Sequence, residues 1–178
     1  AYSSDSIELG ESVVITGKAS GGTTPYLYGV YYKKTTSTTW STAQSYKSNN
    51  KVVVKPAAAV KYDVCIKVKD ATGKIEKKYF VVDVVKPLTN NSTLSAETIK
   101  KGETVTATGK ATGGTTPYLY GVYYKKTTST TWSTAQSYKS NSKVVIKPAA
   151  AVKYDICIKV KDATGKIEKK YFELTVTK

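Results

Sequence analysis

The chain has 178 residues, with 13 acidic residues, 28 basic residues that are all lysine, and a formal net charge of +15. Histidine and arginine are absent, and there are only two cysteines. Without an imidazole there is no Ser-His-Asp or Cys-His catalytic pair, and two cysteines cannot build a four-thiolate metal site. We therefore expect no enzyme, no metal site and no cofactor.

An internal repeat organises the chain. Residues 21–40 recur unchanged as residues 113–132, which is an offset of 92 positions. Residues 21–80 differ from their second copy at three positions, whereas residues 1–20 match theirs at only nine. The offset predicts two domains, residues 1–86 and 93–178. We expect the six residues between them, 87–92 (PLTNNS), to form a linker because Pro, Asn and Ser favour turns.

Apolar and polar residues alternate within each copy, which is typical of strands with one buried face. In chain order, the alternating runs of the first copy are residues 13–19, 26–32, 52–54, 62–68 and 80–84. Turn-forming residues separate them, and the only helix-like stretch is 56–60 (PAAAV), long enough for a single turn. About seven short strands in about 86 residues predict an all-β fold of two tandem immunoglobulin-like antiparallel β-sandwiches. A closed barrel is the structural alternative.

Two strings in each copy resemble a known family. GGTTPYLYGVYYKK and KYDVCIKVKDATGK resemble the start and finish of bacterial extracellular immunoglobulin-like repeats of the PKD-like and triple-tyrosine types. The matching positions are Tyr26, Tyr28, Tyr62, Val64, Ile66, Val68, Asp70 and Gly73. Val30 stands where PKD-like repeats often carry Trp, and the YYKK continuation is closer to the triple-tyrosine type. The resemblance implies display on the surface of, or secretion from, gut bacteria, and it implies no chemistry.

The candidate binding residues are aromatic. Tyr31 alternates with core-facing residues, so we expect it on the outer face, as a binding residue or as a plain surface tyrosine. Trp40 follows a Thr/Ser stretch, 35–39, expected to be a flexible or glycosylated hairpin tip, and it either caps the core or projects outward. Tyr and Trp make good anchors because they combine a large area with few rotatable bonds. The full candidate set is Tyr31, Trp40, Tyr46, Tyr123, Trp132 and Tyr138.

Two further residue pairs receive structural interpretations. Tyr62 and Tyr154 stand at the start of the penultimate predicted strand, where immunoglobulin-like sandwiches place a tyrosine corner. Cys65 and Cys157 interrupt the apolar alternation and should point away from the core. We therefore predict no disulfide within a domain and a half-covered, inert thiol. The alternatives are an intermolecular bridge or a thiol activated by the flanking lysines.

The leading functional hypothesis is a non-catalytic tandem binding and display module of a bacterial cell-surface protein. It would bind a host glycoprotein, with immunoglobulin among the candidates, through outer-face tyrosines presented twice. The alternatives are a structural stalk and a module that binds carbohydrate or a cell-wall polymer. We expect no specific nucleic-acid binding because arginine is absent. We expect no membrane insertion because no apolar run approaches about 20 residues.

Overall fold

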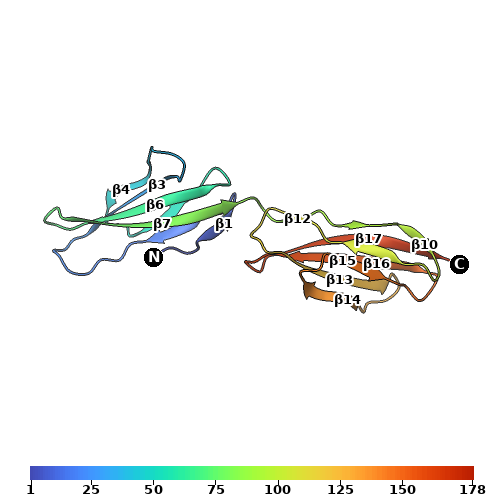
Figure 1. Ribbon diagram of the computed structural model, residues 1–178. Helices are drawn as coiled ribbons and strands as arrows, with labels where there is room; N and C mark the ends of the chain where they lie inside the picture. Colours follow the sequence, from blue (N-terminus) through green and yellow to red (C-terminus); the bar gives the residue numbers. More distant parts are fainter. The chain divides into compact units, whose positions relative to one another are not determined.

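The computed structural model describes all residues 1–178, and the chain forms two compact units, Ala1–Lys86 and Pro87–Lys178. Both units are built from strands and turns, without a helix (Figure 1). The strands of the first unit are β1 (Ser6–Glu8), β2 (Val13–Thr16), β3 (Leu27–Lys34), β4 (Ser41–Lys47), β5 (Lys51–Val54), β6 (Lys61–Lys69) and β7 (Ile75–Val85). The strands of the second unit are β8 (Thr89–Asn90), β9 (Thr93–Leu94), β10 (Thr98–Lys100), β11 (Val105–Thr108), β12 (Ala111–Thr112), β13 (Leu119–Lys126), β14 (Ser133–Lys139), β15 (Lys143–Ile146), β16 (Lys153–Lys161) and β17 (Ile167–Thr177).

Each unit is a sandwich of two layers. The larger layer is a five-stranded sheet, ordered β1-β7-β6-β3-β4 in the first unit and β10-β17-β16-β13-β14 in the second. In each of these sheets the first strand, β1 or β10, runs parallel to the last strand of the unit, β7 or β17. All other neighbouring strands in the two sheets are antiparallel. The opposing layer is β2-β5 in the first unit and β15-β11-β9 in the second. These orders are those of an immunoglobulin-like sandwich, so the predicted all-β fold is confirmed and the closed barrel is excluded.

The core lies between the layers and follows the predicted alternation. Val13 and Ile15 of β2 are fully buried against Val30 of β3 and Val64 of β6, while their neighbours along each strand face outward. The second unit has a separate core cluster built from the corresponding positions. Each unit therefore has a hydrophobic core of its own, as independent folding requires.

Residues 57–60 form a bend, and no part of 56–60 forms the helical turn expected from the PAAAV sequence. A single backbone hydrogen bond closes the bend, from the amide of Val60 to the carbonyl of Ala58 at 3.0 Å. The six residues between β5 and β6 are too few to offset the cost of nucleating a helix, and Pro56 has no amide hydrogen to donate.

Residues 87–92, which we expected to be a linker, are part of the second unit. Thr89 and Asn90 form β8, which pairs with β12, and Leu88 and Ser92 are buried. The reason is that the polar side chains of this segment find partners: the Asn90 side chain donates to the carbonyls of Ile158 and Glu168 at 2.9 and 3.1 Å. A sequence rich in Pro, Asn and Ser is therefore held as an edge strand.

Tyr62 and Tyr154 are buried at the start of β6 and β16, each beside a second tyrosine of its unit. The hydroxyl of Tyr154 accepts a hydrogen bond of 3.2 Å from the amide of Ala150, four residues upstream. A buried phenol bonded to the upstream backbone ties the crossing segment to the strand, which is the role that a tyrosine corner has.

Candidate functional site

The outer face of the five-stranded sheet carries a set of aromatic side chains interleaved with lysines, which we call the aromatic–lysine face. In the first unit it consists of Tyr31, Lys33, Trp40, Tyr46, Lys67, Lys69 and Tyr79, and in the second unit of Tyr123, Lys125, Trp132, Tyr138, Lys159, Lys161 and Tyr171. The strand register explains why these residues meet. Tyr31 of β3 lies opposite Cys65 of β6, which lies opposite Tyr79 of β7. Two tyrosines therefore flank one small side chain across three adjacent strands.

Cys65 and Cys157 point away from the core, as expected, but they are buried rather than half-covered. Both are free thiols. Cys65 lies in a hollow that is also lined by Tyr31, Trp40, Lys67 and Tyr79. The three aromatic rings therefore cover the sulfur. In the second unit, burial raises the pKa of the Cys157 thiol and outweighs the opposing effects of Tyr171, Lys159 and Lys169. The lysines therefore do not activate this thiol.

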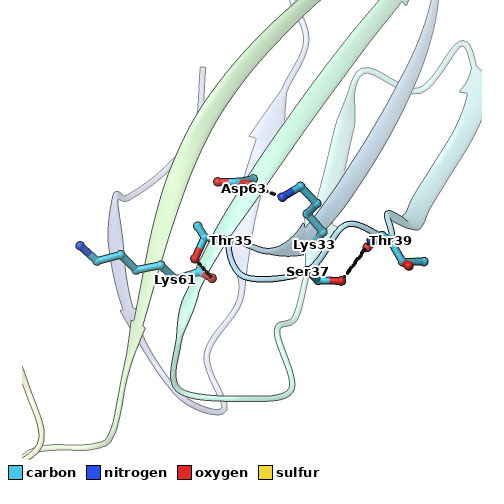
Figure 2. Close-up of polar contacts among 6 residues, drawn as sticks. All are labelled: Lys33, Thr35, Ser37, Thr39, Lys61 and Asp63. Carbon is cyan, nitrogen blue, oxygen red and sulfur yellow. Dashed lines mark hydrogen bonds and ion pairs between the residues drawn. The ribbon is translucent and has the colours of Figure 1, made fainter.

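Trp40 lies on the outer face, outside the core cluster, so of the two placements expected for it the structure adopts the outward one. The loop before it is tied down (Figure 2). The Thr35 amide and hydroxyl both donate to the carbonyl of Lys61, at 3.0 and 3.4 Å, and the Ser37 hydroxyl bonds the backbone of Thr39. Residues 35–39, expected to be a flexible tip, are thus hydrogen-bonded to the first residue of β6 and within the loop itself.

Trp40 and Tyr79 form the most exposed part of the face. Their ring centroids lie 6.2 Å apart at an interplanar angle of 56°, and the residues are 37% and 59% exposed. A hollow of about 330 Å³ lies on the Tyr31 and Cys65 side of the pair, and another of about 390 Å³ lies on the Phe80 and Val81 side. Two tilted rings between shallow hollows offer apolar area that a partner can cover.

Lysine ammonium groups lie over the rings. The Lys67 Nζ is 4.4 Å from the centre of the Tyr31 ring, and the Lys69 Nζ is 5.8 Å from that of Tyr46. Lys33 is shared, with its Nζ 2.7 Å from Asp63 Oδ2 (Figure 2) and 5.4 Å from the Trp40 ring. Each cation–π contact restricts both side chains and keeps positive charge at the aromatic surface. The lysines and rings of the face are therefore packed against one another in the free chain.

The phenols of Tyr46 and Tyr138 remain protonated at neutral pH because their pKa values are raised. Burial raises the pKa of Tyr46, and the neighbouring Tyr31 and Cys65 raise it further. Tyr138 shows the same upward direction, again with burial as the largest cause. Since an unperturbed tyrosine already titrates near pH 10, these hydroxyl groups act as neutral hydrogen-bond donors.

The second unit repeats the geometry closely. The Trp132 and Tyr171 centroids lie 6.3 Å apart at 54°, and the Lys159 Nζ is 4.3 Å from the Tyr123 ring. Lys125 is 5.4 Å from the Trp132 ring and 2.7 Å from the Asp155 carboxylate. The chain therefore presents the same surface chemistry twice.

All six aromatic residues that the sequence indicated lie on these two faces, three on each: Tyr31, Trp40 and Tyr46 in the first unit, and Tyr123, Trp132 and Tyr138 in the second. The sequence reasoning missed Tyr79 and Tyr171, which are the most exposed members. The available signal was their place next to the inward-facing Phe80 and Phe172, because alternation puts them on the outer face.

The structure holds no group of three or more Cys, Asp or Glu side chains suited to a metal ion. None of its elements is a helix of the length and apolar character needed to cross a bilayer. What the aromatic–lysine face can do chemically is bind, through apolar area, phenol donors and positive charge.

No family model and no curated protein matches the chain. Solved structures with a similar fold include the IgVJ-C2 molecule of amphioxus, at 10% identity and a TM-score of 0.46 over 96% of this chain and 99% of that one. A Ca²⁺-stabilised, ice-binding adhesin of an Antarctic bacterium matches at 22% identity and a TM-score of 0.44, over 98% of this chain and 46% of that one. Fibronectin(III)-like modules of CbhA from Clostridium thermocellum match at 14% identity and a TM-score of 0.43, over 97% and 89%. With identities this low and TM-scores below 0.5, the function is inferred from the site alone.

Proposed function

We propose that the chain is a non-catalytic, bivalent binding segment of an extracellular bacterial surface protein, and that the aromatic–lysine face of each unit contacts the partner. The observation that carries the proposal is the recurrence of the Trp40 and Tyr79 pair, with its lysines, as Trp132 and Tyr171. Exposed aromatic rings held in place by cations lose little conformational freedom on binding, so more of the contact energy appears as affinity.

The net positive charge of each copy supports a partner with an acidic or glycosylated surface. The first copy has 13 lysines against seven acidic residues, a net +6, and the second has 15 against six, a net +9. Lysines around an apolar patch steer an acidic or glycosylated surface toward it and raise the association rate, more so at low salt. We propose a host glycoprotein as the partner, and immunoglobulin is the first to test.

Two equal sites on one chain favour a repetitive partner. If both units engage the same surface, the second binding event is intramolecular and the apparent affinity rises by about 10²- to 10⁴-fold over one site. The weak binding expected of a single shallow face is then sufficient.

The proposal is tested by binding of the full chain to immobilised immunoglobulin and to a glycan array. Replacing Trp40 and Tyr79 by alanine removes the face of the first unit, and the same changes at Trp132 and Tyr171 remove the second. We expect loss of avidity, about 100-fold or more, when either face is removed, and loss of detectable binding when both are.

Matched control variants change exposed apolar residues on the opposite layer. Val53 and Val145 are 63% and 64% exposed on β5 and β15, so serine at both positions alters apolar surface of the other sheet. If the valine variants lose as much binding as the aromatic variants do, the proposed site is wrong. Binding to glycans but not to immunoglobulin assigns the face to carbohydrate or cell-wall polymer, and no binding to either assigns the chain to a stalk.

A further inference from the structure

The two units differ at one edge although their sequences there are nearly the same. In the second unit, β8 pairs with β12, with Asn90 opposite Ala111 and Thr89 opposite Thr112. In the first unit the residues that correspond to β12, Ala19 and Ser20, belong to no strand and are exposed. A groove of about 480 Å³ lies beside them, lined by Lys18, Gly22, Tyr26 and Asp70 among others.

In the second unit, residues 87–92 occupy the corresponding place. Leu88 is buried and packs so closely on Gly114 that an added Cβ there would come within 3.1 Å of the leucine side chain. The Asn91 amide donates to the Lys110 carbonyl at 2.8 Å, and the Lys110 amide donates to the Ser92 hydroxyl at 3.1 Å. A leucine anchor and an extended backbone therefore hold the segment at the edge.

Polar side chains complete this contact. Asn90 Nδ2 bridges two strands by donating to the carbonyls of Ile158 in β16 and Glu168 in β17. The Lys170 ammonium donates to the Ser92 carbonyl at 2.9 Å. The first unit has the same residues at the corresponding positions, Ile66, Glu76 and Lys78. Every residue that the segment uses in these contacts thus has an identical counterpart in the first unit, and three of these counterparts, Lys18, Gly22 and Glu76, line the open groove.

Residues beside the occupied groove of the second unit are more buried than their counterparts beside the open groove of the first unit. Asp162 and Val160 are buried, at 4% and 0% exposure, whereas their counterparts Asp70 and Val68 are only half-buried. Asp70 makes the same local hydrogen bonds as Asp162, so the difference comes from the covering segment and not from the loop itself.

The groove is also retained where the copies otherwise diverge. Residues 1–20 match residues 93–112 at nine positions, and the longest run of matches is 16–19, TGKA in both copies. That run contains Lys18 and Ala19, which line the groove.

We propose that the groove of the first unit binds an extended segment of the 87–92 type, joined directly in front of Ala1. At the 92-residue offset, residues 87–92 correspond to the six positions preceding residue 1. The segment adds an edge strand by main-chain pairing, and its leucine and first asparagine give specificity. The complete structural unit is then a connector followed by its repeat, and each repeat is completed by the connector before it. This inference is independent of the proposed function.

The test appends Pro-Leu-Thr-Asn-Asn-Ser to the N-terminus of the full chain and measures hydrogen exchange of the amides of residues 18–20. Peptides covering residues 13–20 (VVITGKAS) differ in mass from those covering 105–112 (VTATGKAT), so mass spectrometry resolves the two units. We expect exchange at residues 18–20 to slow by about tenfold or more, toward the rate at residues 110–112, because edge pairing protects these amides.

The matched control appends the same six residues with serine in place of the leucine and the first asparagine. Both extensions remove the terminal ammonium of Ala1, which otherwise donates to the Thr16 carbonyl at 2.8 Å, so that change cancels. The converse variant, Leu88→Ser with Asn90→Ser, should speed exchange at residues 110–112 to the rate of the open groove. Unchanged exchange at residues 18–20, or equal slowing by the control, overturns the proposal, as does continued protection of residues 110–112 in the converse variant.

Discussion

Replacing Asp162 by alanine should destabilise the second unit by about 3 kcal/mol. Its carboxylate accepts four hydrogen bonds: from the Thr164 amide at 2.9 Å and hydroxyl at 2.7 Å, and from the amides of Lys166 and Thr115, each at 3.0 Å. The Thr115 bond joins two loops 47 residues apart and contributes about 2 kcal/mol, as bonds to buried charged groups do. The bonds within the turn contribute about 1 kcal/mol more, because the exposed Thr164 and Lys166 regain water when the carboxylate is lost.

Each unit contains one tryptophan, so fluorescence can follow one unit at a time. In a Trp40→Phe background, urea unfolding monitored by Trp132 reports on the second unit alone. With a slope of about 1.2 kcal/mol per molar urea, a loss of 3 kcal/mol lowers the midpoint by about 2.5 M. Far-UV circular dichroism without urea shows whether the variant remains folded.

The matched control is Asp70→Ala, followed through Trp40 in a Trp132→Phe background. Asp70 accepts the same four bonds but faces the open groove, so its donors are already near water. We expect a smaller destabilisation than for Asp162. Equal losses at the two positions would refute the reasoning that the covering segment strengthens the network.

The same carboxylate makes stability depend on pH. Burial by itself would raise the pKa of Asp162, but hydrogen bonds from Thr164, Thr115 and Lys166 lower it below its ordinary value. A carboxyl whose pKa is lower in the folded state stabilises the fold above its unfolded pKa, near about 3.9, and this stabilisation is lost as the pH falls through the folded pKa. Asp162→Asn should therefore flatten the acid limb of the stability curve of the second unit below about pH 4, and an unchanged limb would contradict the assignment.

Two further predictions concern buried side chains of the second unit. Tyr154→Phe should lower the free energy of unfolding of the second unit by about 1 kcal/mol in the urea assay, because it removes the hydrogen bond between the hydroxyl and the Ala150 amide and leaves the ring packing intact. An unchanged midpoint would show that this hydrogen bond is not net stabilising. Cys157 should react with a thiol reagent at least about tenfold more slowly in the native chain than in urea, because it is buried and its pKa is raised, and Tyr171→Ala should speed the native reaction. Equal native and denatured rates would mean that the rings do not cover the sulfur.

The sequence predicted the faces of the strands because alternation depends only on neighbouring residues. Val30 and Tyr31 were correctly assigned to opposite sides of β3 on this basis. The cross-strand register was not predictable, because pairing Tyr31 with Cys65 and Cys65 with Tyr79 depends on the lengths and conformations of the loops that join the strands. The cover that the rings give Cys65 follows from this register.

The segment 87–92 shows a second limit of sequence reasoning. Its Pro, Asn and Ser residues favour turns in isolation, and the chain indeed passes from one unit to the next there. Tertiary contacts override that preference, because Leu88 packs on Gly114 and the Asn90 side chain donates hydrogen bonds to the carbonyls of Ile158 and Glu168. A single leucine in a polar hexapeptide was the available signal.

The aromatic–lysine face and the groove occupy different parts of one unit, and this separation explains how the chain can be built from repeats. The face is carried by the outer side of β3, β4, β6 and β7, together with Trp40 just before β4, whereas the groove lies at the edge that follows β2. A connector that fills the groove therefore leaves Trp40 and Tyr79 uncovered, just as residues 87–92 leave Trp132 and Tyr171 uncovered in the second unit. Duplicating a 92-residue segment would then repeat both the proposed stabilisation at the edge and the proposed binding at the face, because the two use different parts of the unit.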